Sequence, residues 1–133
     1  MVAAVVTATG ITFLVDRIDN STTATNFWIA WGTGGSGTGA TATSADTGLK
    51  AAATEAFAAA TLSQPDTDTN RFVATITAGT AKTIEEVIVF GGTTTATSTA
   101  SNRCIIRANH GGQALATGDA IQYTVNLIAT GVP

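Results

Sequence analysis

A period of two in the second half of the chain constrains the fold more than any other feature of this sequence. Apolar residues occupy every second position of residues 71–77 and again of residues 121–129. Side chains of a strand point alternately to its two faces, so this alternation is typical of antiparallel strands that are buried on one face. Both segments are therefore predicted strands, with these residues facing inward: Phe72, Ala74, Ile76, Ile121, Tyr123, Val125, Leu127 and Ala129.

Two more strands are predicted between those segments. Residues 84–90 are apolar on both faces after their two glutamates, as expected for a central strand or for one that meets a neighbouring subunit. Residues 102–108 form the other strand, with Cys104, Ile106 and Ala108 on one face and Arg103, Ile105 and Arg107 on the opposite face.

The charges on these two strands suggest a contact between them. Glu85 and Glu86 are adjacent and point to opposite faces of a strand, which makes them unsuitable as a paired acid and base. We predict instead that Glu86 pairs across the sheet with Arg103 or Arg107. The intervening segments, 91–101 and 109–118, are predicted loops.

The segment 26–39, NFWIAWGTGGSGTG, changes abruptly from a bulky strand to a glycine-rich loop. Its strand places Phe27, Ile29 and Trp31 on one face and Trp28 on the other, so both faces need cover. The loop spells G-x-G-x-x-G, as a dinucleotide-binding turn does, but residues 38–43 are small and β-branched and do not open a helix for a pyrophosphate. A Walker loop is also disfavoured, because no lysine follows. A tightly turning loop is the preferred interpretation.

Two short helices are predicted near the front of the chain. Apolar residues at 11, 14, 15 and 18 have helical spacing, and residues 44–57 combine a Ser44 or Asp46 cap with an alanine-rich body. Together with the strands they predict a mainly β protein, an antiparallel β-sandwich with one or two short helices near the N-terminus. We expect a single domain over residues 1–133, with residues 1–9 as an N-terminal arm that becomes ordered on a partner.

Composition limits the function classes. Charged residues make up 11% of the chain, against about 25% in typical soluble proteins, so we expect much of the surface to lie against other protein. A net charge of −3 with six cations disfavours nucleic acid. The N-terminal sequence lacks the pattern of an export signal, and no stretch has the ~20 apolar residues of a membrane span. Cys104, the single cysteine, excludes an intrachain disulfide.

Sequences that could carry chemistry are few. The turn 65–70 offers Asp66, Asp68 and Asn70 in the spacing of calcium ligands, but the glycine and glutamate that a calcium loop requires are missing. A Cys104–His110 dyad would require the strand to fold back from the predicted turn that holds the histidine. Trp28, Trp31 and Tyr123 could stack on sugars, although aromatic residues at strand spacing are more often core. We therefore predict no catalytic, cofactor-binding or metal-binding residue and no enzymatic activity.

The order of segments along nearly the whole chain resembles a family of small virion proteins of tailed bacteriophages. The corresponding segments here are 30–34, 46–55, 84–90 and 118–124, which are similar to the family's GWGTG strand end, DTALxxE segment, ITEAGLF strand and GDSIQFT strand. The sequence departs from that pattern at Ile88, where the family has glycine, and in the alanine-rich segment after Asp46.

The resemblance implies a structural protein of the virion with no catalytic residue and no cofactor. A capsid decoration or cement protein that stabilises the shell fits the small single domain best. A tail, collar or fibre-associated protein is the alternative, and a carbohydrate-binding module is a third. The expected partners are further copies of the chain, most simply as a homotrimer, and the major capsid protein or tail proteins. The expected location is the virion, after synthesis in the host cytoplasm.

Overall fold

The computed structural model describes residues 4–18, 26–34, 41–55, 57–92 and 104–129. Its elements, in chain order, are β1 (Ala4–Val6), α1 (Ala8–Ile18), β2 (Asn26–Gly32), β3 (Ala58–Ala59), β4 (Thr61–Asp66), β5 (Thr69–Thr77), β6 (Lys82–Gly92), β7 (Cys104–Leu115) and β8 (Ala120–Ile128). The described chain is mainly β, as the sequence predicts.

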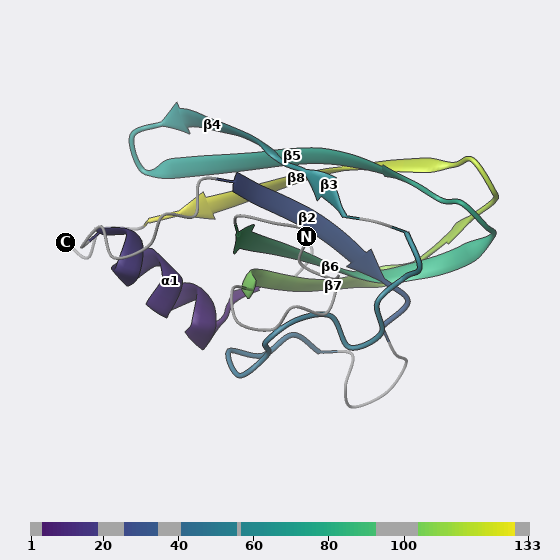
Figure 1. Ribbon diagram of the computed structural model, residues 1–133, viewed down its shortest axis with the longest axis horizontal. Helices are drawn as coiled ribbons and strands as arrows, with labels where there is room; N and C mark the ends of the chain where they lie inside the picture. The colour runs from purple at the N-terminus through teal and green to yellow at the C-terminus, as the bar shows by residue number, and fades with distance from the viewer. Residues whose placement is uncertain (1–3, 19–25, 35–40, 56, 93–103, 130–133) are drawn as a thin grey trace.

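The strands form two antiparallel sheets that pack face to face (Figure 1). The five-stranded sheet has the order β1-β7-β6-β2-β3, and the three-stranded sheet has the order β4-β5-β8. All strand pairs are antiparallel. The predicted antiparallel β-sandwich is therefore confirmed, and the predicted turn over residues 65–70 is the hairpin between β4 and β5.

The main hydrophobic core lies between the sheets, where the predicted inward faces of β5 and β8 meet β2, β6 and β7. A second cluster covers the outer face of the five-stranded sheet and contains Ala30, Leu49, Ile88, Phe90 and Cys104, with Trp28, Ala52 and Phe57 packed against it. β2 and β6 contribute to both clusters. Both of their faces are thus covered within the chain, and the apolar character of residues 84–90 is explained by the central position of β6 without a neighbouring subunit.

The first predicted helix is confirmed as α1, which begins three residues before the predicted start at Ile11. Thr7 explains the earlier start, because its side-chain oxygen accepts a hydrogen bond from the backbone N–H of Gly10 at 3.0 Å, as an N-cap residue does. Its hydroxyl also donates to the carbonyl of Cys104 on β7. At Gly10, an added Cβ would collide with the backbone of Ile105, so glycine allows α1 to lie close to the sheet.

The prediction of an N-terminal arm over residues 1–9 is wrong for its described part. Residues 4–6 form β1, which pairs with β7 in register Ala4 with Ala108 and Val6 with Ile106. Thr7 is fully buried. Residues 4–9 are therefore an integral part of the fold, and residues 1–3 lie outside the described residues.

The second predicted helix, residues 44–57, is also wrong. Its described residues form a loop with turns, in which the N–H of Ala53 donates to the carbonyl of Trp31 at 3.2 Å and the carbonyl of Ala51 accepts from the N–H of Thr33 at 2.8 Å. These bonds to the end of β2 replace the i to i−4 bonds of a helix. Tertiary partners thus override the helix propensity of the alanine-rich segment.

β7 departs from the prediction in two ways. It continues to Leu115, so His110 lies within a strand and the predicted loop over residues 109–118 is reduced to its end. Its register with β6 also shifts, since Val89 pairs with Ile106 while Phe90 pairs with Cys104. This bulge leaves Ile105 unpaired and places Cys104 on the opposite face from Ile106, contrary to the predicted alternation. Most of the other predicted loop, residues 93–101, lies outside the described residues, as does Arg103.

Candidate functional site

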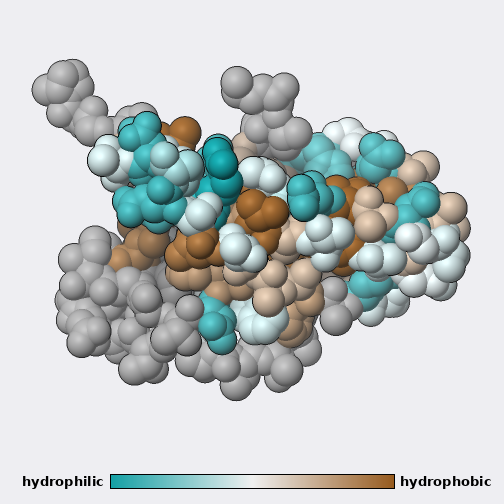
Figure 2. Space-filling view, turned by 90° about the horizontal axis from the view of Figure 1, so that it is seen from above, coloured by the Kyte–Doolittle hydropathy of each residue, from teal (hydrophilic) through white to brown (hydrophobic). Residues whose placement is uncertain are grey.

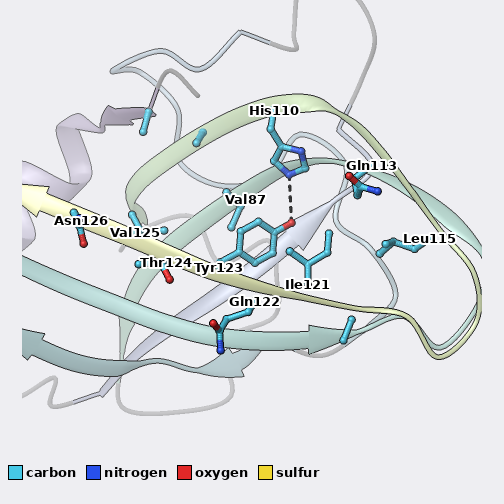
Figure 3. A pocket seen from close by; sticks show the side chains of 13 residues that line it. Val87, His110, Gln113, Leu115, Ile121, Gln122, Tyr123, Thr124, Val125 and Asn126 are labelled. Atoms are coloured by element: carbon cyan, nitrogen blue, oxygen red, sulfur yellow. Dashed lines mark hydrogen bonds between the residues drawn. The ribbon is translucent and has the colours of Figure 1, made fainter. Parts of the chain in front are cut away.

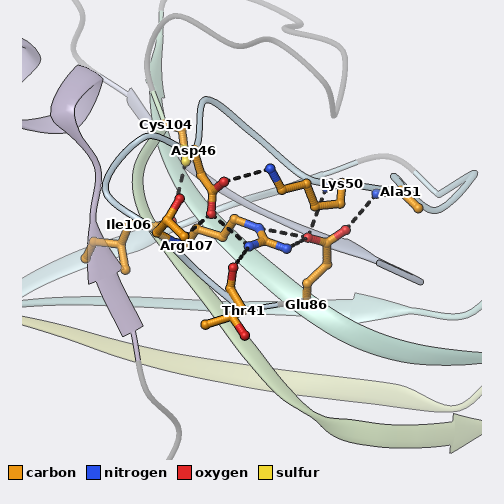
Figure 4. A network of polar contacts seen from close by, with 9 residues as sticks. Thr41, Asp46, Lys50, Ala51, Glu86, Cys104, Ile106 and Arg107 are labelled. Carbon is orange, nitrogen blue, oxygen red and sulfur yellow. Dashed lines mark hydrogen bonds and ion pairs between the residues drawn. The ribbon is translucent and has the colours of Figure 1, made fainter. Parts of the chain in front are cut away.

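Two sites combine polar side chains with defined geometry, and the first is a buried ionic network on the outer face of the five-stranded sheet (Figure 4). The guanidinium of Arg107 on β7 contacts the carboxylate of Glu86 on β6 through Nε at 3.0 Å and Nη2 at 2.7 Å. Neither side chain is exposed to solvent. The predicted cross-sheet pairing of Glu86 is confirmed with Arg107 as its partner.

Asp46 supplies a second anion to the same guanidinium. Its Oδ2 lies 2.8 Å from Nη1 of Arg107, and its Oδ1 lies 2.7 Å from Nζ of Lys50. Burial alone would raise the pKa of Asp46, but hydrogen bonds from Lys50, from the backbone N–H of Thr43 and from Arg107 outweigh it and lower the pKa to about 2. Two carboxylates and two cations balance within the network, so the sequence-based assignment of Asp46 as a helix cap is replaced by an ionic role.

The backbone around Glu86 completes the network. Its Oε1 accepts a hydrogen bond from the N–H of Ala51 at 2.8 Å, and its Oε2 accepts one from the N–H of Lys50 at 3.0 Å. A Cβ at Gly32 or Gly34 would collide with the Glu86 side chain. The first glycines of the GTGGSGTG loop therefore make room for a buried carboxylate. Residues 35–40 of the predicted turning loop lie outside the described residues.

The network thus connects β6, β7 and the loop 41–55 by charge-assisted hydrogen bonds. Its carboxylates and cations are paired with one another, so we assign the network a structural role. It holds the loop 41–55 against the sheet and so covers the outer hydrophobic cluster.

The second site is a groove of about 670 Å³ between the edges of the two sheets (Figure 3). One wall is formed by seven consecutive residues of β8, from Ala120 to Asn126, and the other by residues of β7 with Val87 of β6 and Ala4 of β1. His110 and Tyr123 face each other across it, with Nε2 and the phenol oxygen 3.3 Å apart. Burial raises the pKa of Tyr123. Among the described residues that line the groove there is no aspartate, glutamate, lysine or arginine.

The three aromatic residues considered for sugar stacking do not form one exposed surface. Trp31 is in the core with 1% of its surface exposed, and its ring meets that of Tyr123 edge to face at 6.5 Å. Trp28 lies on the opposite face of β2 and packs edge to face against Phe57 at 4.9 Å. Of the three, Tyr123 alone lines the groove.

Cys104 and His110 lie on opposite faces of the five-stranded sheet, so the structure does not bring them together as a dyad. Cys104 belongs to the outer cluster, where burial raises its pKa to about 12. His110 faces the groove. A thiol with so high a pKa is a poor nucleophile near neutral pH. Its complete burial in the outer cluster makes Cys104 a core residue.

In the calcium-like turn, the two aspartates accept hydrogen bonds from the residues that follow them. Asp66 Oδ1 accepts from the N–H of Thr67 at 2.7 Å, and Asp68 Oδ1 accepts from the hydroxyl of Thr69 at 2.8 Å. Within the described ranges, no three His, Cys, Asp or Glu side chains gather in a way that could hold a metal ion. No helix of the described chain is long and apolar enough to cross a bilayer.

Comparisons with known protein families, with characterised proteins and with solved structures give no match for this chain. The groove is the feature that sequence reasoning missed. The alternation of residues 121–129 identifies the apolar face that lines it, but period alone does not encode which strands of the two sheets lie side by side.

Proposed function

We propose that this chain is a structural protein of a tailed-bacteriophage virion, and that it decorates the assembled capsid as a cement protein. Two features support the proposal. One is the order of segments that resembles the virion family along nearly the whole chain. The other is a β-sandwich in which several of the few charged side chains are held in ion pairs within the chain.

The disposition of charge is the observation that carries the proposal furthest. The chain has only six lysines and arginines and nine acids. Of these, Asp46, Glu86 and Arg107 are consumed in the buried network, and Lys82 is bound to Glu55. Most of the exposed positions of β4 and β8 carry uncharged side chains, chiefly threonine, serine, glutamine and asparagine, and Asp66 at the end of β4 is the charged exception. A surface of this kind suits persistent contact with other protein better than free dispersion.

Two large apolar side chains of the three-stranded sheet are also exposed, one on each of its faces. Leu62 on β4 is 47% exposed and Ile128 on β8 is 53% exposed. Viewed from above Figure 1, brown hydrophobic residues form an interrupted band among pale and teal ones (Figure 2). Neutral hydroxyl groups with interspersed apolar side chains provide contacts that salt screens weakly, unlike charge pairs.

A cement protein adds binding free energy across many subunit boundaries of a shell. We therefore expect particles that lack the chain to assemble but to rupture at a lower temperature, and the added protein to restore the rupture temperature. Retention on purified particles should be the same at 0.1 M and 1 M salt, because screening shortens from about 10 Å to about 3 Å without affecting neutral contacts. Release by salt alone, or an unchanged rupture temperature, contradicts the proposal and favours a tail position.

A homo-oligomer is part of the proposal, and a trimer is its expected form. The low charge of the chain is now the only argument for an oligomer. The apolar faces of β6 no longer support it, because both are covered within the chain. Sedimentation of the purified protein, and of protein released from particles, tests it. A species of 13.3 kDa in both samples excludes the oligomer.

A further inference from the structure

We infer that the free edge of β8 is a docking site for an uncharged extended segment of a partner protein, which adds to the three-stranded sheet as a further strand. The site is the groove between β8 and β7, and the mode is main-chain pairing along a sheet edge. It does not depend on the capsid assignment, because the groove and the edge are properties of the fold.

The outermost strands of the two described sheets, and the part of β7 that extends beyond β1, differ in a way that singles out β8. That part of β7 is irregular, because its register with β6 shifts between Asn109 and Gln113. An exposed edge invites pairing with other chains, and proteins protect edges with short strands, proline, charge or bulges. β1 and β3 have three and two residues. β4 contains Pro65 and Asp66, and its register with β5 shifts between Ser63 and Asp66.

β8 has none of these protections. Its nine residues, AIQYTVNLI, include neither proline nor a charged side chain. Its register with β5 is unbroken from Ala120 paired with Thr77 to Ile128 paired with Thr69. Within the described residues, no strand pairs with its other side. β8 is therefore a long, regular edge with main-chain groups available to another strand.

The hydrogen bonds at the two ends of β8 show which groups are available. The carbonyl of Asp119 accepts from Ala78, and the N–H of Ala129 donates to Asp68, so odd-numbered residues bond towards the β5 side. In an antiparallel strand the direction alternates with each residue. The N–H and C=O groups of Gln122, Thr124 and Asn126 thus face the free edge.

The groove provides the space for an added strand and sets its chemistry. It is lined by β8 from Ala120 to Asn126, so seven residues of edge are accessible from it. The opposite wall carries Val87, Ala108 and Leu115, and the described residues of both walls include no Asp, Glu, Lys or Arg. A charged segment would lose its hydration there without gaining an ionic partner. The segment that fits is uncharged, with small or β-branched side chains.

A second copy of this chain fits the groove less well than a single strand. Pairing β8 with β8 about a two-fold axis would place both five-stranded sheets on the same side of the joined three-stranded sheets. Ala4 of β1 and Ala108 of β7 flank the groove, so the same elements of the second copy would have to occupy the space beside them. A lone strand meets no such conflict.

The test uses the full chain and a synthetic seven-residue peptide that alternates valine with threonine, acetylated and amidated so that it is uncharged. Amide hydrogen exchange is followed by NMR with and without the peptide. In the free protein, Tyr123 and Val125 exchange slowly and Thr124 exchanges fast. With the peptide, exchange slows by at least about tenfold at Gln122, Thr124 and Asn126, as one added hydrogen bond each would give.

Two controls separate strand addition from non-specific contact. Thr124→Pro removes the outward N–H without removing a bond to β5, and it should weaken peptide binding by at least about fivefold, whereas Thr124→Ala should leave it within about twofold. If Thr124→Pro does not fold, a peptide N-methylated at every residue, which has no N–H donor on either edge, replaces it on the unaltered chain and should not bind. A peptide with glutamate in place of threonine should also fail to bind, because its charges would lose their hydration in the groove.

Two results would overturn the inference. One is unchanged exchange at the three outward residues at saturating peptide. The other is slow exchange at those residues in the free protein together with a dimer in sedimentation, which would show that a second copy already occupies the edge.

Discussion

Replacement of Arg107 by methionine tests the most unusual feature of the fold, a fully buried guanidinium between two carboxylates. Methionine keeps much of the length of the side chain and removes the charge. Glu86, with no exposed surface, then loses this cation, and Asp46, with 3% exposed, keeps only its contact with Lys50. Removal of one partner from a buried ion pair costs about 3–5 kcal/mol. For a domain of this size that loss corresponds to a fall in melting temperature of roughly 10–20 °C.

The pH dependence distinguishes lost charge pairing from lost packing. In the unaltered protein the pKa of Asp46 is lowered from 3.8 to about 2, so its contribution is fully present above pH about 4 and is lost as pH falls through about 2. That contribution is about 2 kcal/mol. In Arg107→Met, by contrast, the penalty belongs to the charged carboxylates, so it shrinks as pH falls and Asp46 becomes protonated.

The assay is urea denaturation of both proteins at pH 7 and pH 3, with Arg71→Met as the matched control. Arg71 bonds to Asn126 at the exposed surface, and its replacement should cost less than about 1 kcal/mol. A loss below about 1 kcal/mol for Arg107→Met at pH 7, or a loss that does not shrink at pH 3, refutes the ionic role assigned to the network.

Three further predictions follow from the same structure. Gly34→Ala places a methyl group against the Glu86 carboxylate and should lower the free energy of unfolding by about 1–3 kcal/mol in urea denaturation. Gly111→Ala, where a Cβ meets nothing within 4 Å, should be near neutral, and equal losses for the two variants would contradict the role of Gly34. Thr7→Val removes the cap of α1 and a bond to β7, so melting should show a loss of about 1–2 kcal/mol, and an unchanged melting temperature would indicate that residues 4–9 do not stabilise the fold. Treatment with a divalent-ion chelator should leave the melting temperature unchanged, and a fall of several degrees would reveal a metal site.

The strands were predictable because their information is local. Alternation in residues 71–77 and 121–129 identifies a half-buried strand from its own side chains, and two apolar faces identify β6 as central. The pairing of Glu86 with an arginine was accessible for a related reason. The predicted central strand places Glu85 and Glu86 on opposite faces, and the next predicted strand carries Arg103 and Arg107 on one face, so a buried glutamate has few other ways to neutralise its charge.

The errors come from segments whose partners are distant in sequence. Residues 44–57 have helix propensity, but their amides bond to Glu86 and to the end of β2, which no local pattern encodes. The bulge at Ile105 reverses the face of Cys104 by a single unpaired residue. The groove depends on β7 and β8 belonging to different sheets although they follow one another in the chain, so it could be found only from the assembled sandwich.

The central claim is that this chain decorates a phage capsid, and a cryo-EM map of the virion that contains it tests this most directly. The account predicts repeated density for the β-sandwich on the outside of the capsid shell, at symmetry-related positions across subunit boundaries, in contact with the shell through neutral surface. Density for the sandwich confined to the tail, collar or fibres, with a bare shell, would contradict it.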